Sequence, residues 1–334
     1  MGAIDIEGTS YKDLLRLYIE TRDEKALYGA EQISKGFIRD GIPPEEIIHL
    51  HIKSMEELGQ DIPAEQLKGM NFLLETMISY GMAMKEYQAL REKQLEIKSE
   101  LKIAADMQKT LLATTVPVVE NLDIGVTSVA AHEMNGDYHH FVLGENGEIG
   151  IALADVRGKG IPAALCMSMI KYSMDSLPEK TMTPKRILKN LNRVVEKNVD
   201  SSMFITMFYA QYFPETSKFN FASAGHEPGF YYHGDTQEFE EIKTKGLVLG
   251  VSSEAEYPEY EQILKQGDMI VLLTDGVTEC RYGDSFLESD EVLQVIKQYM
   301  HLPAQEMTEQ VYKHFERLQD FHLRDDFTLI ILKR

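Results

Sequence analysis

The sequence has no tryptophan, only two cysteines (Cys166 and Cys280) and far fewer basic than acidic residues. Two lone cysteines do not make a disulfide framework and fit a reducing compartment, so we expect a cytoplasmic protein. The formal net charge of −20 argues against nucleic acid and against anionic membranes as partners, because both recruit basic surfaces. No run approaches the roughly 18 apolar residues that a transmembrane helix needs, and residues 1–8 do not resemble an export signal.

Several common catalytic motifs are also missing. Neither His-Glu-x-x-His nor Cys-x-x-Cys occurs, which disfavours a zinc hydrolase. Residues 158–163 match a dinucleotide-binding glycine pattern, but Asp155 stands just before them, where it would repel a pyrophosphate. Lys159 is followed by glycine and not by Ser or Thr, so a P-loop is excluded. A dinucleotide oxidoreductase is therefore only a minor alternative.

The N-terminal part of the chain has helical periodicity. Apolar residues recur at helical spacing in residues 11–19, and a second helical stretch of residues 24–40 stops at Gly41. Pro44 and Pro63 suit the first turns of two more helices. We predict an all-α four-helix bundle in residues 1–84. We find no catalytic or ligand-binding motif in the sequence of the bundle, so its predicted role is dimerisation and partner docking.

Residues 85–118 are predicted to form a helical linker that ends at Pro117. One heptad position holds Tyr87, Gln94, Leu101 and Gln108, and the other holds Leu90, Ile97, Ala104 and Leu111. Glutamine and alanine weaken such a seam while helping to set its register. The linker is therefore either a plain connecting helix or a coiled coil that forms when two chains are brought together.

Residues 119–334 have the sequence pattern of a domain that contains both helices and strands. Strand-like runs cover residues 122–130, 138–143, 148–155, 203–213, 218–224, 229–232, 268–274 and 326–333. Helices are expected at 161–177, 183–199, 289–300 and 303–319. Many strands follow one another with no helix between them, which favours antiparallel sheets with segregated helices over a doubly wound parallel sheet. The predicted fold class of the whole chain is α+β.

Four acids border strand-like runs of this domain, namely Asp137, Asp155, Asp275 and Asp326. A single Asp-Gly pair is usually a turn signal. Four carboxylates at the ends of buried runs would repel one another if they converged, and hard cations such as Mg²⁺ or Mn²⁺ are the usual remedy. The pattern predicts a binuclear metal centre, and centres of that kind hydrolyse phosphate esters.

The segments around these acids resemble the metal-dependent (PPM, type 2C) serine/threonine phosphatases, in particular their bacterial sporulation and stress-response branch. The matching segments are Gly136-Asp137-Tyr138, Ala154-Asp155-Val156-Arg157-Gly158-Lys159-Gly160, Ser223-Ala224-Gly225-His226, Thr274-Asp275-Gly276 and Asp325-Asp326-Phe327-Thr328. They span about residues 119–334, and residues 96–112 resemble the helix that leads into such domains. The resemblance implies an α/β-sandwich of two antiparallel sheets flanked by helices.

The resemblance also implies roles for the acids. Asp137 would bridge two ions, Mn²⁺ or Mg²⁺. Asp155 and the main-chain carbonyl of Val156 would complete the first metal site, and Asp275 and Asp326 would hold the second. Water activated by the ions would attack phosphorus in line, without a covalent phosphoenzyme.

One part of the family pattern is missing. Some members bind the substrate phosphate through an arginine near the start of the domain, but residues 119–135 contain no Arg or Lys. The remaining candidates for phosphate binding are Arg157, Lys159 and metal-bound water, and the general acid is unassigned. His226 at a strand end could hydrogen-bond near the site or be a structural histidine.

By the same resemblance, the substrate is a phosphorylated anti-anti-sigma protein of the STAS fold. The implied activator is a kinase-like switch protein that docks on residues 1–84 and so promotes general stress sigma factor activity. We expect a homodimer in which docking orders the linker seam and biases helix 161–177. Two alternatives are a pseudo-phosphatase interaction module and a metal-dependent phosphodiesterase or nucleotide hydrolase.

Overall fold

The computed structural model describes residues 5–6, 9–59, 62–145, 147–158, 160–176, 183–200, 203–278, 280–282, 285–286, 289–319, 321 and 323–334. Contacts divide the chain into two compact units, Met1–Lys98 and Ser99–Arg334. Helix α4 (Ala64–Leu111) has residues in both units. Among the described residues, none of the helices is both long enough and apolar enough to cross a bilayer.

The N-terminal unit is helical apart from a short strand pair. It contains β1 (Asp5–Ile6), β2 (Thr9–Ser10), α1 (Tyr11–Thr21), α2 (Glu24–Arg39), α3 (Pro44–Glu57) and the first part of α4. The Tyr11 hydroxyl lies 2.9 Å from His51 Nδ1, and Lys12 pairs with Glu57 at 2.8 Å, so α1 packs against α3. The buried apolar side chains of this unit come from α2, and they are Ala26, Ile33 and Phe37.

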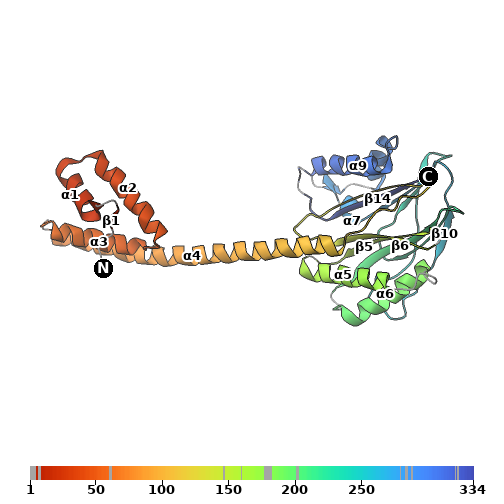
Figure 1. The fold of residues 1–334 in the computed structure, drawn as a ribbon, viewed down its shortest axis with the longest axis horizontal. Helices are drawn as coiled ribbons and strands as arrows, with labels where there is room; N and C mark the ends of the chain where they lie inside the picture. The colour runs from red at the N-terminus through yellow and green to blue at the C-terminus, as the bar shows by residue number, and fades with distance from the viewer. Residues whose placement is uncertain are drawn as a thin grey trace. The chain divides into compact units, whose positions relative to one another are not determined.

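The second unit contains two five-stranded antiparallel sheets (Figure 1). The first sheet has the order β10 (Tyr260–Ile263), β7 (Lys218–Ala224), β6 (Ile205–Phe213), β5 (Ile149–Val156), β4 (Asp137–Leu143). The second has the order β3 (Asp123–Val129), β14 (Phe327–Lys333), β11 (Met269–Leu273), β8 (Phe230–His233), β9 (Glu238–Glu241). A third, two-stranded pair is β12 (Arg281–Tyr282) with β13 (Ser285–Phe286).

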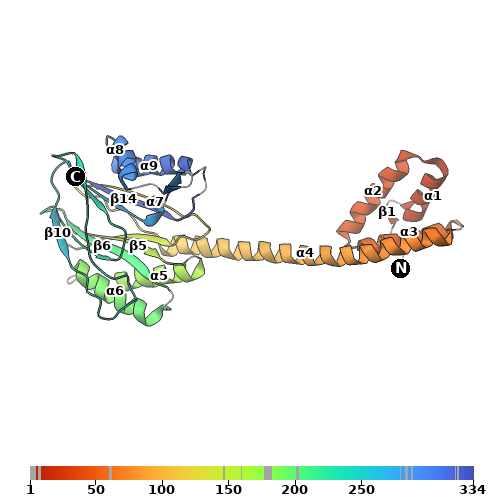
Figure 2. The ribbon, with the colours of Figure 1, turned by 180° about the vertical axis from the view of Figure 1, so that it is seen from behind.

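Helices cover the outer faces of both sheets, as Figures 1 and 2 show. Helices α5 (Ile161–Asp175) and α6 (Pro184–Asn198) pack on the first sheet around buried residues such as Met167 and Leu188. Helices α8 (Ser289–Gln298) and α9 (Ala304–Leu318) pack on the second around Phe315 and Phe327. A third apolar cluster lies between the sheets and contains residues of both, including Ile151, Phe208, Ile270 and Ile330. The result is a four-layer helix–sheet–sheet–helix sandwich.

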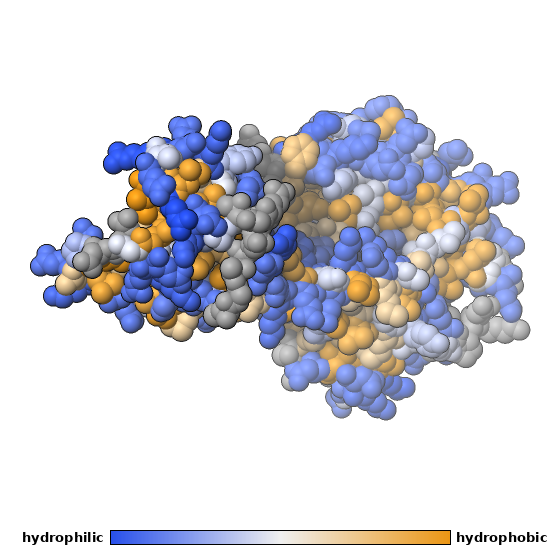
Figure 3. All heavy atoms as spheres, turned by 60° about the vertical axis from the view of Figure 1, so that its left-hand side comes forward, coloured by the Kyte–Doolittle hydropathy of each residue, from blue (hydrophilic) through white to orange (hydrophobic). Residues whose placement is uncertain are grey.

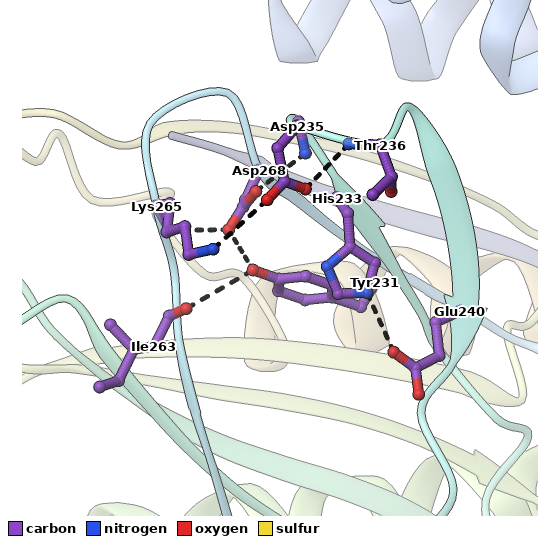
Figure 4. Close-up of polar contacts among 9 residues, drawn as sticks. Tyr231, His233, Asp235, Thr236, Glu240, Ile263, Lys265 and Asp268 are labelled. Carbon is purple, nitrogen blue, oxygen red and sulfur yellow. Dashed lines mark hydrogen bonds and ion pairs between the residues drawn. The ribbon is translucent and has the colours of Figure 1, made fainter.

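A buried carboxylate joins the sheets at one end of β11 (Figure 4). Asp268, which precedes β11, is 3% exposed and accepts hydrogen bonds from the Tyr231 hydroxyl and from the main-chain N–H groups of Gly234 and Lys265. The same hydroxyl lies 3.5 Å from the carbonyl oxygen of Ile263 in β10 of the other sheet. Burial, together with the neighbouring carboxylate, raises the pKa of Tyr231, so its hydroxyl stays protonated and keeps its donor role.

The predicted fold class is confirmed, because a helical N-terminal region precedes two antiparallel sheets flanked by helices. Each predicted strand and helix of residues 119–334 has a counterpart in the structure, with ends within about two residues. The predicted fourth helix and residues 85–111 of the predicted linker form one continuous helix, α4; the helix ends before residues 112–118, which were predicted to continue it to Pro117. Strands β9 and β10 were not predicted, and neither were the two-residue strands β1, β2, β12 and β13; the β1–β2 pair departs from the all-α prediction for residues 1–84.

Candidate functional site

The four predicted acids come in pairs, two from each sheet. Asp137 is the first residue of β4, and its cross-strand partner is Asp155, near the end of β5. Asp275 lies one residue beyond the end of β11, after Thr274, and opens the short helix α7 (Asp275–Thr278). Asp326 immediately precedes β14, which pairs with β11. The end of β11 that meets these acids is opposite the end that carries Asp268.

Asp137 is the acid that joins the two sheets. The residue is 4% exposed, and its Oδ2 accepts hydrogen bonds from the hydroxyls of Thr274 (2.7 Å), which directly follows β11, and Thr328 (2.6 Å) in β14, both strands of the second sheet. Burial raises the pKa of Asp137 well above its usual value, the two hydroxyl donors oppose that rise, and the charges of Asp155 and Asp326 add to it. An acid in this environment is stabilised in its charged form by a nearby cation.

Asp326 is held by main-chain amides. Its Oδ1 accepts from the N–H of Ala131 at 2.8 Å, and its Oδ2 accepts from the N–H of Gly136 at 2.5 Å. The side chain is 7% exposed. Because Gly136 directly precedes Asp137, this contact brings the end of β14 to the start of β4 and places two of the predicted ligands on adjoining segments.

Two glycines permit the close approach of oxygen atoms at the site. A Cβ on Gly136 would lie 3.1 Å from Asp326 Oδ2, 3.6 Å from the carbonyl oxygen of Gly158 and 3.7 Å from that of Val156. A Cβ on Gly276 would overlap the main-chain oxygen of Asp326. Gly276 follows Asp275, so Asp275 and Asp326 are also on adjoining segments. A side chain at position 276 would clash with backbone, whereas one at position 136 would require Asp326 Oδ2 to shift by a few tenths of an ångström.

The oxygen atoms gathered here are suited to hard cations. Carboxylates and a main-chain carbonyl are the ligands that Mg²⁺ and Mn²⁺ take in proteins. The mutual repulsion that raises the pKa of Asp137 is the interaction that a cation would relieve. Within the described part of the chain, no three His, Cys, Asp or Glu side chains already stand at the spacing of metal ligands. The residues fit a metal centre in their chemistry and burial.

Thr274 and Thr328 are contacts of Asp137 that the sequence analysis did not single out. Each is fully buried, and each occurs in a run of apolar residues. Thr328 also donates its main-chain N–H to the hydroxyl oxygen of Thr274 at 3.1 Å, which fixes both hydroxyls beside Asp137. A hydroxyl residue inside an otherwise apolar strand, next to an acid of interest, is the signal that could have identified them.

His226 lies beside the site, as one of its two predicted roles required. Its Nδ1 is 2.9 Å from the hydroxyl of Thr206, and that hydroxyl donates to the main-chain oxygen of Asp155 at 3.4 Å. Burial lowers the pKa of His226 to about 4, so the imidazole is neutral at physiological pH. A neutral, buried histidine supports the backbone of Asp155 and contributes no positive charge.

Of the two side chains that are candidates for binding the substrate phosphate, the structure describes Arg157. Arg157 is exposed, and its guanidinium carbon lies 4.9 Å from the centre of the Phe204 ring. The main-chain N–H of Arg157 donates to the main-chain carbonyl of Phe204 at 3.0 Å. Arg157 directly follows Val156, so its backbone is anchored next to the site while its side chain faces solvent. Lys159 lies outside the described residues.

Comparison with known proteins gives matches in both units. The family "Stage II sporulation protein E (SpoIIE)" matches residues 145–334, more than half of the chain. The family "Phosphoserine phosphatase RsbU, N-terminal domain" matches residues 9–83. The two matches leave residues 1–8 and 84–144 outside the matched ranges.

Curated relatives and solved structures agree with these families. Phosphoserine phosphatase RsbU of Bacillus subtilis is 54% identical over 97% of this chain and 96% of its own length. Phosphoserine phosphatase RsbP of the same organism is 21% identical over 71% of this chain and 58% of its own length.

Two solved structures share the fold of the C-terminal unit. The PP2C domain of SiaA from Pseudomonas aeruginosa has a TM-score of 0.61 at 18% identity, covering 73% of this chain and 98% of that one. The RsbU and RsbW domains of a Mycobacterium tuberculosis protein give 0.57 at 24% identity, covering 67% and 62%. The chain therefore belongs to the RsbU phosphoserine phosphatases, a branch of the PP2C-type SpoIIE family of protein-serine/threonine phosphatases.

Proposed function

We propose that this phosphatase removes phosphate from a phosphoserine of an anti-anti-sigma protein of the STAS fold, and so promotes the activity of a general stress sigma factor. The observation that carries the proposal is the 54% identity to RsbU over nearly the whole length of both chains. A match over both units supports a shared substrate and shared regulation more strongly than a match of the phosphatase domain alone.

PP2C-type phosphatases are metal-dependent, and we propose two ions, Mn²⁺ or Mg²⁺, at the four acids. Asp137 would bridge them. Asp155 and the Val156 carbonyl would complete one site, and Asp275 and Asp326 the other. Three observations support this assignment: the pairing of Asp137 with Asp155, the amides that hold Asp326 next to Asp137, and the contact of Gly276 with the backbone of Asp326.

The protein's own residues have defined tasks in the proposed reaction. When bound, such ions lower the pKa of water and offset negative charge on the phosphoryl oxygens. Thr274 and Thr328 hold the Asp137 carboxylate in one orientation. The exposed guanidinium of Arg157, which lies over the Phe204 ring, is the described one of the two cationic candidates for binding the substrate phosphate.

We further propose that residues 1–84 bind the kinase-like activator and form a homodimer in the cytoplasm. The N-terminal unit exposes many large apolar side chains, including Leu27, Tyr28, Ile38 and Phe72. Figure 3 shows apolar surface among the hydrophilic side chains on the face of this unit turned to the viewer. Exposed apolar surface of this kind is typical of protein interaction sites. Docking would order the seam of the linker, residues 85–118, and bias α5, which follows Asp155 in the chain.

The test is release of inorganic phosphate from the phosphorylated STAS protein by the full-length chain. We expect release to require Mn²⁺ or Mg²⁺, to rise when the kinase-like partner is added, and to fall at least about a hundredfold in Asp275→Ala, because lost transition-state stabilisation of several kcal/mol has that effect.

The matched control is Asp235→Ala, since the Asp235 side chain is 62% exposed in the same domain. Full activity in Asp275→Ala would refute the ligand assignment. Hydrolysis of phosphodiesters or nucleotides but not of the phosphoserine would favour the phosphodiesterase alternative. An inert chain that still binds the STAS protein would favour the pseudo-phosphatase.

A further inference from the structure

Gln108 is a buried polar residue near the C-terminal end of α4. Its side chain is 5% exposed, whereas most neighbouring residues of the helix face solvent. Its Nε2 donates to the main-chain oxygen of Asn135 at 2.7 Å, and its Oε1 accepts from the main-chain N–H of Asn135 at 3.1 Å. One side-chain amide therefore satisfies both polar groups of one backbone residue, in the way that a neighbouring strand does. Asn135 is held to α4 by this double contact.

Asn135 in turn is connected to both the main chain and the carboxylate of Asp137. Its side-chain oxygen accepts from the N–H of Asp137 at 2.9 Å. Its side-chain nitrogen donates to the hydroxyl of Ser128 at 3.2 Å. The Ser128 hydroxyl lies 2.9 Å from that of Thr328, which donates to Asp137 Oδ2 at 2.6 Å. These contacts form a closed ring that fixes the backbone and the carboxylate of Asp137 together.

The space around Gln108 allows its hydrogen bonds to be removed without disturbing the packing. Gln108, Asn135 and Asp137 line one cavity of about 320 Å³ next to α4. A side chain of similar length at position 108 therefore has room, and its replacement does not force the surrounding core apart. What such a replacement removes is the pair of hydrogen bonds to Asn135.

We propose that Gln108 is a positioning residue for the metal ligand Asp137, acting through Asn135. The inference rests on the proposed metal centre. Hydrogen-bond partners behind a metal ligand set its orientation, and losing one typically weakens metal binding or activity by about 10–100-fold. Gln108 differs from such usual partners in coming from the helix that enters the domain and not from the sandwich itself.

The test compares Gln108→Met with Gln88→Met in the full-length chain. Methionine keeps the length and helix propensity of glutamine but has no amide, and Gln88 is exposed on the same helix. We expect Gln108→Met to bind Mn²⁺ about tenfold more weakly by isothermal titration calorimetry. With p-nitrophenyl phosphate at saturating Mn²⁺, kcat should fall while KM stays within about twofold of the parent value. Gln88→Met should match the parent in every measurement. Parent-like Mn²⁺ affinity in Gln108→Met would overturn the proposal.

A double-mutant cycle with Asn135→Ala tests whether Gln108 acts on Asp137 through Asn135. If Gln108 acts through the Asn135 side chain, adding Gln108→Met to Asn135→Ala should weaken Mn²⁺ binding by less than about twofold. Additive losses would mean that Gln108 only supports the fold, and would overturn the proposal. Asn135→Ala leaves the sequence of α4 unchanged. If Gln108→Met fails to fold, the Mn²⁺ affinity of Asn135→Ala alone still tests whether the Asn135 side chain positions Asp137. A parent chain that binds no Mn²⁺ would refute the metal centre itself, whereas a metal-binding parent matched by Gln108→Met would refute only this inference.

Discussion

At the scale of single residues, the surroundings of Asp137 oppose its charged form and raise its pKa. Burial is the largest influence on its pKa and favours the neutral acid, and Asp155 and Asp326 add like charges. The two threonine hydroxyls favour the carboxylate. A carboxyl group whose pKa is raised on folding destabilises the folded state fully above its folded pKa. This destabilisation shrinks as the pH falls from the folded to the unfolded pKa and is gone below the unfolded pKa. The metal-free protein should therefore be destabilised by this residue at neutral pH.

We expect Asp137→Asn to stabilise the metal-free chain at pH 7.5, because asparagine can still accept from the threonines without a buried charge. A gain of about 1 kcal/mol would raise the melting temperature by about 2–4 °C in a domain of this size. The gain should shrink at pH 5.5, where the parent's Asp137 is closer to protonation. Thermal unfolding in EDTA at both pH values checks this, and a less stable variant at pH 7.5 would contradict the electrostatic argument.

The positions of the acids at strand ends could be predicted from the sequence, but their mutual arrangement could not. The pairing of Asp137 with Asp155 depends on the register of β4 and β5, and nothing in either apolar run specifies that register. The roles of Thr274, Thr328 and Asn135 depend on contacts between segments more than 100 residues apart or between a turn and a sheet. Such contacts leave no periodic pattern in the sequence.

At the scale of elements, the strands that were predicted are those with apolar runs. Strands β9 and β10 have the sequences EFEE and YEQI, and they lie at the edges of their sheets, half exposed. An edge strand buries few side chains, so it lacks the apolar signature on which the prediction relied. Helix α4 is continuous because no proline interrupts residues 64–111. The predicted boundaries at 84 and 118 stay predictions, and the contact division falls at Lys98.

The buried Asp268 gives a prediction for element packing. In Asp268→Asn, one of the donors that now meet the carboxylate would face an NH₂ group instead, which costs about 1–3 kcal/mol. The melting temperature should fall by roughly 2–10 °C. The kcat for p-nitrophenyl phosphate at 25 °C should be unchanged, because Asp268 and Asp275 are at opposite ends of β11.

The matched control for this change is Asp235→Asn, an exposed position that should shift stability by no more than about 0.5 kcal/mol. A selective loss of kcat in Asp268→Asn, with the melting temperature unchanged, would show that the two ends of β11 are coupled in a way the contacts do not suggest.

At the scale of the whole molecule, the proposed ligands connect metal binding to stability. Asp137 and Asp155 belong to one sheet, and Asp275 and Asp326 flank strands of the other. Ions held by all four acids would bind the assembled sandwich and not the unfolded chain. Binding of that kind stabilises the folded state by about 2.7 kcal/mol when the free ion is at 100 times its dissociation constant.

We therefore expect Mn²⁺ to raise the melting temperature of the C-terminal unit, observed in the full-length chain, by roughly 5–10 °C at saturation. EDTA should reverse the shift, and Asp275→Ala should show little of it. Differential scanning calorimetry with KCl at matched ionic strength as the control separates ion binding from screening. A melting temperature that does not respond to millimolar Mn²⁺ would argue against a metal centre between the sheets.

The strand order β3-β14-β11 has a consequence for when the enzyme can become active. Strand β14 is inserted between β3 and β11, whose sequences are separated from each other by more than a hundred residues. Asp326 and Thr328 reach the acids of β4 and β5 only once that insertion is complete. On the proposed ligand assignment, a chain in which β14 is not yet paired should be inactive, because Asp326 and Thr328 would not reach Gly136 and Asp137.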